Sequence, residues 1–133
     1  MITITLDTNI VAYLLKGLYD VEKKIKAEIS NGNKLVINPI TYYEVCRGLI
    51  AINSSAKLHT FKEICELFGV VELTKASLER SAVIYADLKN KGLLIEDADI
   101  FIGAICLENN YTLVTNNEKH FSRIDGLKYI NWT

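Results

Sequence analysis

The sequence predicts an α/β fold in three layers, α/β/α, with a central, mostly parallel sheet of four to five strands. Short stretches rich in β-branched residues alternate with helical stretches, which is the pattern of βαβ units. The stretch 100–107 (IFIGAICL) has no polar side, and a helix that is apolar all round belongs inside a domain. With 133 residues, the chain can bury such a core as a single domain, residues 1–133.

Five stretches have the composition of strands, with β-branched and aromatic residues between turn residues such as Gly, Asn and Asp. They are 2–6, 34–38, 70–73, 111–115 and 127–132. Apolar residues at helical spacing occupy the segments between them. The expected helices are 10–15, 20–29, 39–52, 56–68, 74–91, 98–108 and a single turn at 118–121.

Several of these helices begin at a residue that caps helices well. Asp7 stands where the first strand passes into the first helix, Thr74 caps the helix that runs to residue 91, and Thr41 with Glu44 has the spacing of a capping box. We expect Asp97 to cap the helix that Asp99 then enters. In the helix at 74–91, the apolar face is expected to consist of Leu78, Ala82, Tyr85 and Ala86.

Composition narrows the possible functions. A formal net charge of -1 does not indicate nucleic-acid binding, although a local basic patch would suffice for it. Cys46, Cys65 and Cys106 lie far apart in apolar surroundings, as reduced core thiols do, so neither a disulfide framework nor a zinc site is expected. Two histidines, His59 and His120, further disfavour zinc. No apolar stretch is long enough to cross a bilayer, and the strand-like start shows no signal peptide, so we expect a cytoplasmic protein.

Four polar side chains are expected at one edge of the sheet. Asp7 follows the first strand and Glu44 lies in the helix after the second, while Asp99 begins the buried helix and Asn117 follows the strand at 111–115. Each one alone can be explained as a cap, turn or ion-pair residue. Together they would meet beyond the carboxyl ends of the strands, where open α/β sheets bind ligands.

Three carboxylates within a few ångströms would raise one another's pKa values, and a cation would relieve this repulsion. Oxygen ligands without His or Cys favour Mg²⁺ or Mn²⁺ over zinc. The residues themselves therefore indicate a divalent metal site.

The motifs around these positions resemble those of a known family. They are Asp7-Thr8-Asn9, YYEVCRG around Glu44, DADIFIGA around Asp99, and LVTNNEKHFSRIDGLKYINW over 113–132. Together they resemble the PIN-domain ribonucleases and, more narrowly, the VapC-type toxins of type II toxin–antitoxin pairs. The resemblance covers essentially the whole chain, and its last stretch is the most specific part.

The resemblance implies that Asp7, Glu44 and Asp99 are catalytic and hold Mg²⁺ or Mn²⁺. It places the family's fourth catalytic position, often an Asp, on Asn117, which removes one charge from the site. Asp97 matches an acidic or polar residue that many members carry two positions before the third acid. Thr8 and Thr115 are further accessory candidates, which could orient a carboxylate or water or simply cap a helix.

The implied activity is that of a metal-dependent endoribonuclease that hydrolyses RNA phosphodiester bonds as the toxin of a toxin–antitoxin pair. The basic residues nearest to the expected site are Arg47, Lys119 and Arg123. Each of them could bind RNA phosphates or serve as an ordinary surface residue. The resemblance also implies a homodimer and a cognate antitoxin protein as partner, and no membrane.

Two other interpretations of the sequence compete with that of a PIN-domain ribonuclease. Haloacid-dehalogenase phosphatases also begin with a strand and an Asp, but they need a second Asp two residues later, where this chain has Asn9. The second alternative is a catalytically weak PIN-like module that binds RNA or another protein. Cleavage of RNA by the purified protein with Mg²⁺ or Mn²⁺ separates these readings.

Overall fold

The computed structural model describes residues 1–133 and contains one sheet of four parallel strands. In spatial order the strands are β2 (Lys34–Val36), β1 (Thr3–Leu6), β3 (Tyr111–Val114) and β4 (Lys128–Ile130). The predicted sheet of four to five mostly parallel strands is confirmed. Because Leu6 of β1 pairs with Val114 of β3, the residues that follow these two central strands are neighbours.

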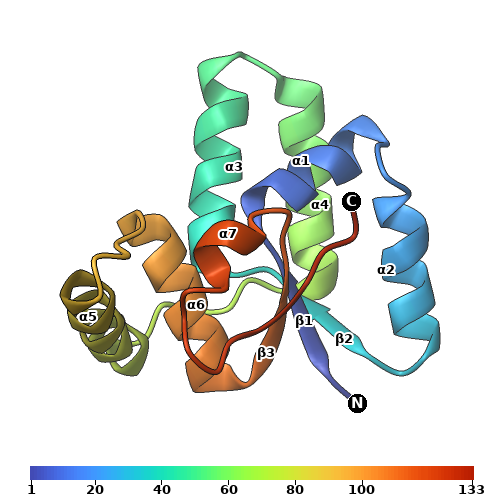
Figure 1. Ribbon diagram of the computed structural model, residues 1–133. Coiled ribbons are helices and arrows are strands. Elements are labelled where there is room, and N and C mark those ends of the chain that lie inside the picture. Colours follow the sequence, from blue (N-terminus) through green and yellow to red (C-terminus); the bar gives the residue numbers. More distant parts are fainter.

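Helices cover both faces of this sheet, as Figure 1 shows. On one face, a core cluster joins the strands to α1 (Thr8–Lys16), α2 (Val21–Ser30), α3 (Pro39–Ala51) and α4 (Ser55–Phe68). On the other face, a second cluster contains residues of α5 (Lys75–Asn90), α6 (Asp97–Asn109) and α7 (Glu118–Phe121). The three-layer arrangement expected from the sequence is therefore present.

The apolar helix α6 lies inside the molecule, as its sequence predicts. Ile100 and the unbroken run 102–106 are buried, so residues on all sides of the helix are covered. Asn110, in the left-handed conformation at φ 56°, ends the helix and turns the chain into β3. Neither α6 nor any other helix has the length and apolarity needed to cross a membrane.

The predicted strand at 70–73 is wrong. Val70 forms a single parallel bridge with Ile37, and the two hydrogen bonds around it join Gly69 and Val71 to Ile37. Beyond Val71 the chain leaves the sheet edge to reach α5 on the opposite face, so the ladder cannot continue. β-rich composition alone did not reveal that this segment is a crossover.

Two of the predicted caps are also wrong. The side chain of Asn38 caps α3 by accepting from the N–H of Thr41, whose own hydroxyl donates to the carbonyl of Leu6 at 3.0 Å. Thr41 and Glu44 therefore form no capping box. Glu96 occupies the N-cap position of α6 without a side-chain hydrogen bond, and Asp97 is the first helical residue.

The buried face of α5 differs from the predicted one. Ser77, Ser81, Ile84 and Leu88 are buried, whereas Leu78, Ala82, Tyr85 and Ala86 are exposed. The predicted N-cap of this helix is confirmed, because the hydroxyl of Thr74 accepts from the N–H of Ser77.

Candidate active site

Asp7 is at the centre of the candidate site. It follows β1 and caps α1, as predicted, and its side chain is buried. Its Oδ1 accepts from the N–H of Thr8 at 2.8 Å, and its Oδ2 accepts from the hydroxyl of Thr115 at 2.8 Å. Thr115 follows β3, so the pairing of the two central strands brings these side chains together.

Burial is the main reason why the pKa of Asp7 is raised above its ordinary value of 3.8. The hydrogen bonds from Thr115 and Thr8 lower the pKa of Asp7, while the charges of Asp99 and Glu44 raise it further. The sequence predicted a raised pKa from carboxylate repulsion. The upward direction of the pKa shift is confirmed, but desolvation of Asp7 contributes more to this shift than repulsion by the other carboxylates does.

Glu44 reaches the site from α3, the helix that follows β2. The hydroxyl of Thr8 donates to its Oε1 at 2.6 Å, and Nη2 of Arg47 lies 3.7 Å from its Oε2. The helix begins at Pro39, so Glu44 lies in its second turn. Since Arg47 is largely exposed, its ion pair with Glu44 is a weak one.

Asp99 lies in the first turn of α6, where a carboxylate also complements the helix dipole. Nδ1 of His120 is 2.9 Å from Oδ2 of Asp99 and 2.9 Å from Nδ2 of Asn117. Nδ2 of Asn117 is itself 3.5 Å from Oδ2 of Asp99. A single ring nitrogen carries one proton or one lone pair, so Nδ1 can donate to Asp99 or accept from Asn117 at a given moment, but not both.

His120 is the site residue that sequence reasoning missed. It was counted only as evidence against zinc, yet it lies three residues after Asn117 in the single-turn helix α7, where side chains three apart share a face. The spacing of three residues between Asn117 and His120 was the feature of the sequence that could have pointed to His120. Asn117, which the sequence allowed as a cap, makes no side-chain cap on α7, and its amide points to Asp99 and His120 instead.

The four predicted edge positions form two groups, which the N–H of Asn117 joins by donating to the hydroxyl of Thr115 at 3.0 Å. Thr8 links Asp7 to Glu44, Thr115 holds Asp7, and Asn117 approaches Asp99. We call Asp7, Glu44 and Asp99 the carboxylate site. The loop after β3 is fixed to α1, because the amide of Asn116 donates to the hydroxyl of Tyr13 at 2.7 Å.

The remaining predicted residues lie in different settings. Asp97 is exposed, and the structure shows no hydrogen bond or ion pair from its side chain. Lys119 is exposed on α7. The guanidinium of Arg123 donates to the carbonyls of Leu93 and Leu94, at 3.2 and 3.3 Å, and so holds the loop between α5 and α6.

The donor chemistry of the carboxylate site fits a hard divalent cation. All three carboxylates offer oxygen, and a positive charge would offset both the desolvation of Asp7 and the repulsion that it experiences. No three His, Cys, Asp or Glu side chains are close enough together to share an ion in their present positions. Each carboxylate is instead held by its own partner, namely Thr115, Thr8 or His120.

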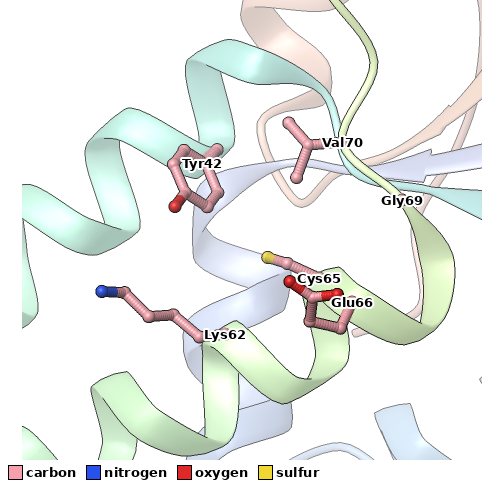
Figure 2. A pocket seen from close by; sticks show the side chains of 6 residues that line it. All are labelled: Tyr42, Lys62, Cys65, Glu66, Gly69 and Val70. Atoms are coloured by element: carbon pink, nitrogen blue, oxygen red, sulfur yellow. The ribbon is translucent and has the colours of Figure 1, made fainter.

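A separate cleft of about 490 Å³ contains none of the predicted site residues. It lies between Tyr42 of α3 and the end of α4, and Figure 2 shows the side chains of Lys62, Cys65 and Glu66 lining it. Burial, followed by the nearby Cys46 and Glu66, raises the pKa of the Cys65 thiol to about 11, so this thiol is protonated and unreactive at neutral pH. The carboxylate site is therefore the better candidate for catalysis.

Comparison with known proteins identifies the family. The model of the PIN domain family matches residues 4–127, which is most of the chain. The chain is 37% identical over 113 residues to ribonuclease VapC1 of Methanocaldococcus jannaschii, a match that covers 84% of this chain and 79% of that relative. This chain belongs to the PIN-domain family, in its VapC group. The resemblance seen in the sequence motifs is confirmed.

Solved structures of VapC-group complexes have the same fold. VapBC2 from Rickettsia felis, bound to a DNA fragment from its promoter, aligns with a TM-score of 0.88 and 26% identity over 99% of this chain and 100% of that chain. VapBC-1 from nontypeable Haemophilus influenzae aligns with a TM-score of 0.83 and 29% identity over 98% of each chain. PIN-domain ribonucleases generally use divalent metal ions, which agrees with the oxygen-rich carboxylate site.

Proposed function

We propose that this protein is a Mg²⁺- or Mn²⁺-dependent endoribonuclease that hydrolyses RNA phosphodiester bonds in the cytoplasm, as the toxin of a toxin–antitoxin pair. The main support is the convergence of Asp7, Glu44 and Asp99 from three separate elements at the edge where parallel sheets bind ligands. The ribonuclease names of its relatives point to the same chemistry. The whole chain acts as one catalytic domain in this proposal.

In this site, Asp7, Glu44 and Asp99 would hold the cation, whose charge would make a water more acidic and would offset negative charge on the leaving oxygen. Thr115 and Thr8 fix the orientation of two of these carboxylates by donating to Oδ2 of Asp7 and Oε1 of Glu44. Asn117 and His120 do the same for Asp99. A neutral amide at position 117 leaves only three carboxylates in the group, which favours a single cation.

Substrate binding requires positive charge near these acids. Arg47 lies beside Glu44, and Lys119 is exposed on α7 close to Asn117, so both can reach phosphates of a bound RNA. Arg123 contributes less, because it is already bonded to two backbone carbonyls.

The test uses three isosteric variants, Asp7→Asn, Glu44→Gln and Asp99→Asn. Each should lower cleavage of structured RNA in Mn²⁺ by orders of magnitude while the circular dichroism spectrum stays native, and each should relieve the growth arrest caused by expressing the chain alone. Glu79→Gln is the matched control, because Glu79 is an exposed acid on α5, outside the carboxylate site, and makes no side-chain hydrogen bond or ion pair. Cleavage that persists in all three variants would reject the proposal.

The neutral amide of Asn117, at the position where the family often has an Asp, favours the alternative of a catalytically weak PIN-like module. That alternative predicts RNA or protein binding by the wild-type chain with no cleavage in either Mg²⁺ or Mn²⁺. The same assay therefore separates the two functions.

We further propose that the partners are a cognate antitoxin and a second copy of this chain. The similar VapBC structures support an antitoxin. A groove of about 400 Å³ between α1, α2 and α4, lined largely by apolar side chains, offers a surface for it. The exposed apolar residues of α5, among them Val83 at 66% exposure, support a homodimer. Light scattering of the wild type and of Val83→Glu tests the dimer.

A further inference from the structure

A second cleft, of about 270 Å³, opens directly from the carboxylate site. It lies between α1 and α3, and its lining includes Thr8 and Glu44, the hydrogen-bonded pair of the site. Lys16 and Lys57 line the same cleft. Thr8 and Lys16 are the first and last residues of α1, so the cleft follows the whole helix, roughly 12 Å at about 1.5 Å per residue.

The two lysines have no partner in the fold. Neither of them makes a salt bridge or a side-chain hydrogen bond, whereas Lys26 and Lys91 each pair with an acid four residues earlier in the chain. Glu44 is the one acid in the lining, and its oxygens are already engaged by Thr8 and Arg47. Two positive charges are therefore available to a ligand in this cleft.

Helix stability does not explain the position of Lys57. It lies in the first turn of α4, which contains no acid, and a cation at a helix N-terminus is unfavourable by about 0.3–1 kcal/mol. Its side chain is only partly exposed and lines the cleft, a position in which a lysine can pack its aliphatic stem and keep its ammonium hydrated. Lys16, by contrast, is favourably placed in the last turn of α1.

The rest of the lining is mostly apolar and open. Leu15, Val45 and Leu49 form part of the wall, and a Cβ added to Gly48 would have nothing within 4 Å. An apolar wall with two ammonium groups along it suits a ligand that carries both apolar rings and negative charge. A nucleic-acid strand, with its riboses, bases and phosphates, has this chemistry.

We propose that the cleft between α1 and α3 is a subsite for RNA flanking the scissile bond, in which Lys16 and Lys57 contact backbone phosphates. This inference rests on the proposed function, because the strand enters the cleft from the carboxylate site. The lysines act in binding, not in the chemical step. They add to the site two cations that the sequence analysis did not select.

The experiment compares two double variants with the same change in charge. Lys16→Gln with Lys57→Gln removes the cations of the cleft. Lys75→Gln with Lys89→Gln is the matched control, because Lys75 is in the first turn and Lys89 in the last turn of α5, away from the cleft. Both are made in the Asp99→Asn protein, and the affinity for a fluorescein-labelled single-stranded RNA of about 12 nucleotides is measured by anisotropy from ~50 to ~200 mM salt.

The cleft variant should bind the RNA roughly ten-fold more weakly, and the slope of log affinity against log salt should be less steep by about 1.4, or ~0.7 for each lost phosphate contact on a single strand. The control should retain the affinity and the slope. If the cleft variant and the control lose RNA affinity equally, or if the cleft variant loses none, the proposed subsite is wrong. Unchanged RNA affinity with weakened binding of the cognate antitoxin would also overturn it and assign the cleft to the protein partner.

Cleavage by the otherwise wild-type chain is measured in parallel, so the two proposals can fail separately. RNA binding without cleavage in Mg²⁺ or Mn²⁺ rejects the proposed function and still tests the subsite through the binding data. If the protein neither binds nor cleaves the RNA, both proposals are rejected.

Discussion

Helices α5 and α6 pack against each other but are stabilised in different ways. In α6, the residues on every side are apolar and six of them are buried. In α5, the contact face contains two serines, Ser77 and Ser81, with Ile84 and Leu88, while Leu78 and Val83 are 44% and 66% exposed. The apolar residues of α6 therefore lie in the core, whereas many of those of α5 lie on the surface.

The N-termini of α5 and α6 also differ, because only one of them depends on a side-chain cap. The side chain of Thr74 caps α5, and the hydroxyl of Ser81 donates to the carbonyl of Ser77 within that helix at 2.8 Å. The N-terminus of α6 has no side-chain cap. Since burial stabilises α6, its first-turn carboxylate Asp99 is left free to face Asp7 and His120. The comparison shows that a helix held by its core can devote its exposed end to a functional site.

The largest effect should come from removing apolar volume in α6. Ile105 is fully buried, and Ile105→Ala should cost about 2–5 kcal/mol of folding free energy, the range for such truncations in a packed core. Urea unfolding monitored by circular dichroism measures this cost. Val83→Ala on the exposed part of α5 is the control and should change the stability by less than about 0.5 kcal/mol in the monomer. Similar costs for both would contradict the contrast between the helices.

A smaller effect is expected on the serine face of α5. Ser81→Leu introduces a large side chain where α5 lies against the core, and overpacking of this kind costs about 1–3 kcal/mol. Leu78→Ser, which makes the opposite exchange on the exposed side, should stay within about 0.5 kcal/mol of the wild type. If the face predicted from the sequence were the buried one, Leu78→Ser would be the more damaging variant.

A pH-dependent effect is expected at Asp7, which faces the first turn of α6. Its folded pKa is above the ordinary value of 3.8, so the folded protein holds a proton that the unfolded chain releases. The metal-free protein should therefore lose stability as the pH rises from about 4 through the folded pKa of Asp7. Asp7→Asn should remove this decline and raise the melting temperature near pH 8, measured by calorimetry in EDTA. Parallel profiles for the two proteins would show that Asp7 does not cause the decline.

The smallest predicted difference concerns the two helix starts. Thr74→Ala removes the side-chain cap of α5 and should cost about 1 kcal/mol, the usual value for such a cap. Glu96→Ala at the N-cap position of α6 should be close to neutral, because the side chain of Glu96 makes no capping bond. Equilibrium unfolding of both variants tests this pair, and an equal loss would indicate that α6 also depends on its cap.

Local pattern determined much of the structure in this chain. The alternation in ITITL, the apolar run of α6 and the capping residues Asp7 and Thr74 each depend on neighbours within a few residues, and all four features are present as predicted. The parallel sheet followed from the order of the elements, since strands separated by helices pair in parallel. This order also placed Asp7, Glu44, Asp99 and Asn117 at one edge of the sheet.

Tertiary structure alone decided the features that depend on contacts between distant segments. His120 joined the site because α7 packs against α6, and Asn38 replaced Thr41 as the cap of α3 because β1 lies beside β2. The stretch at 70–73 became a crossover because the next helix lies on the opposite face of the sheet. The buried face of α5 was set by its fit against α6, where small serine side chains allow close packing. Hydrophobic periodicity reports which residues favour burial, but only the packed neighbours determine which of them are covered.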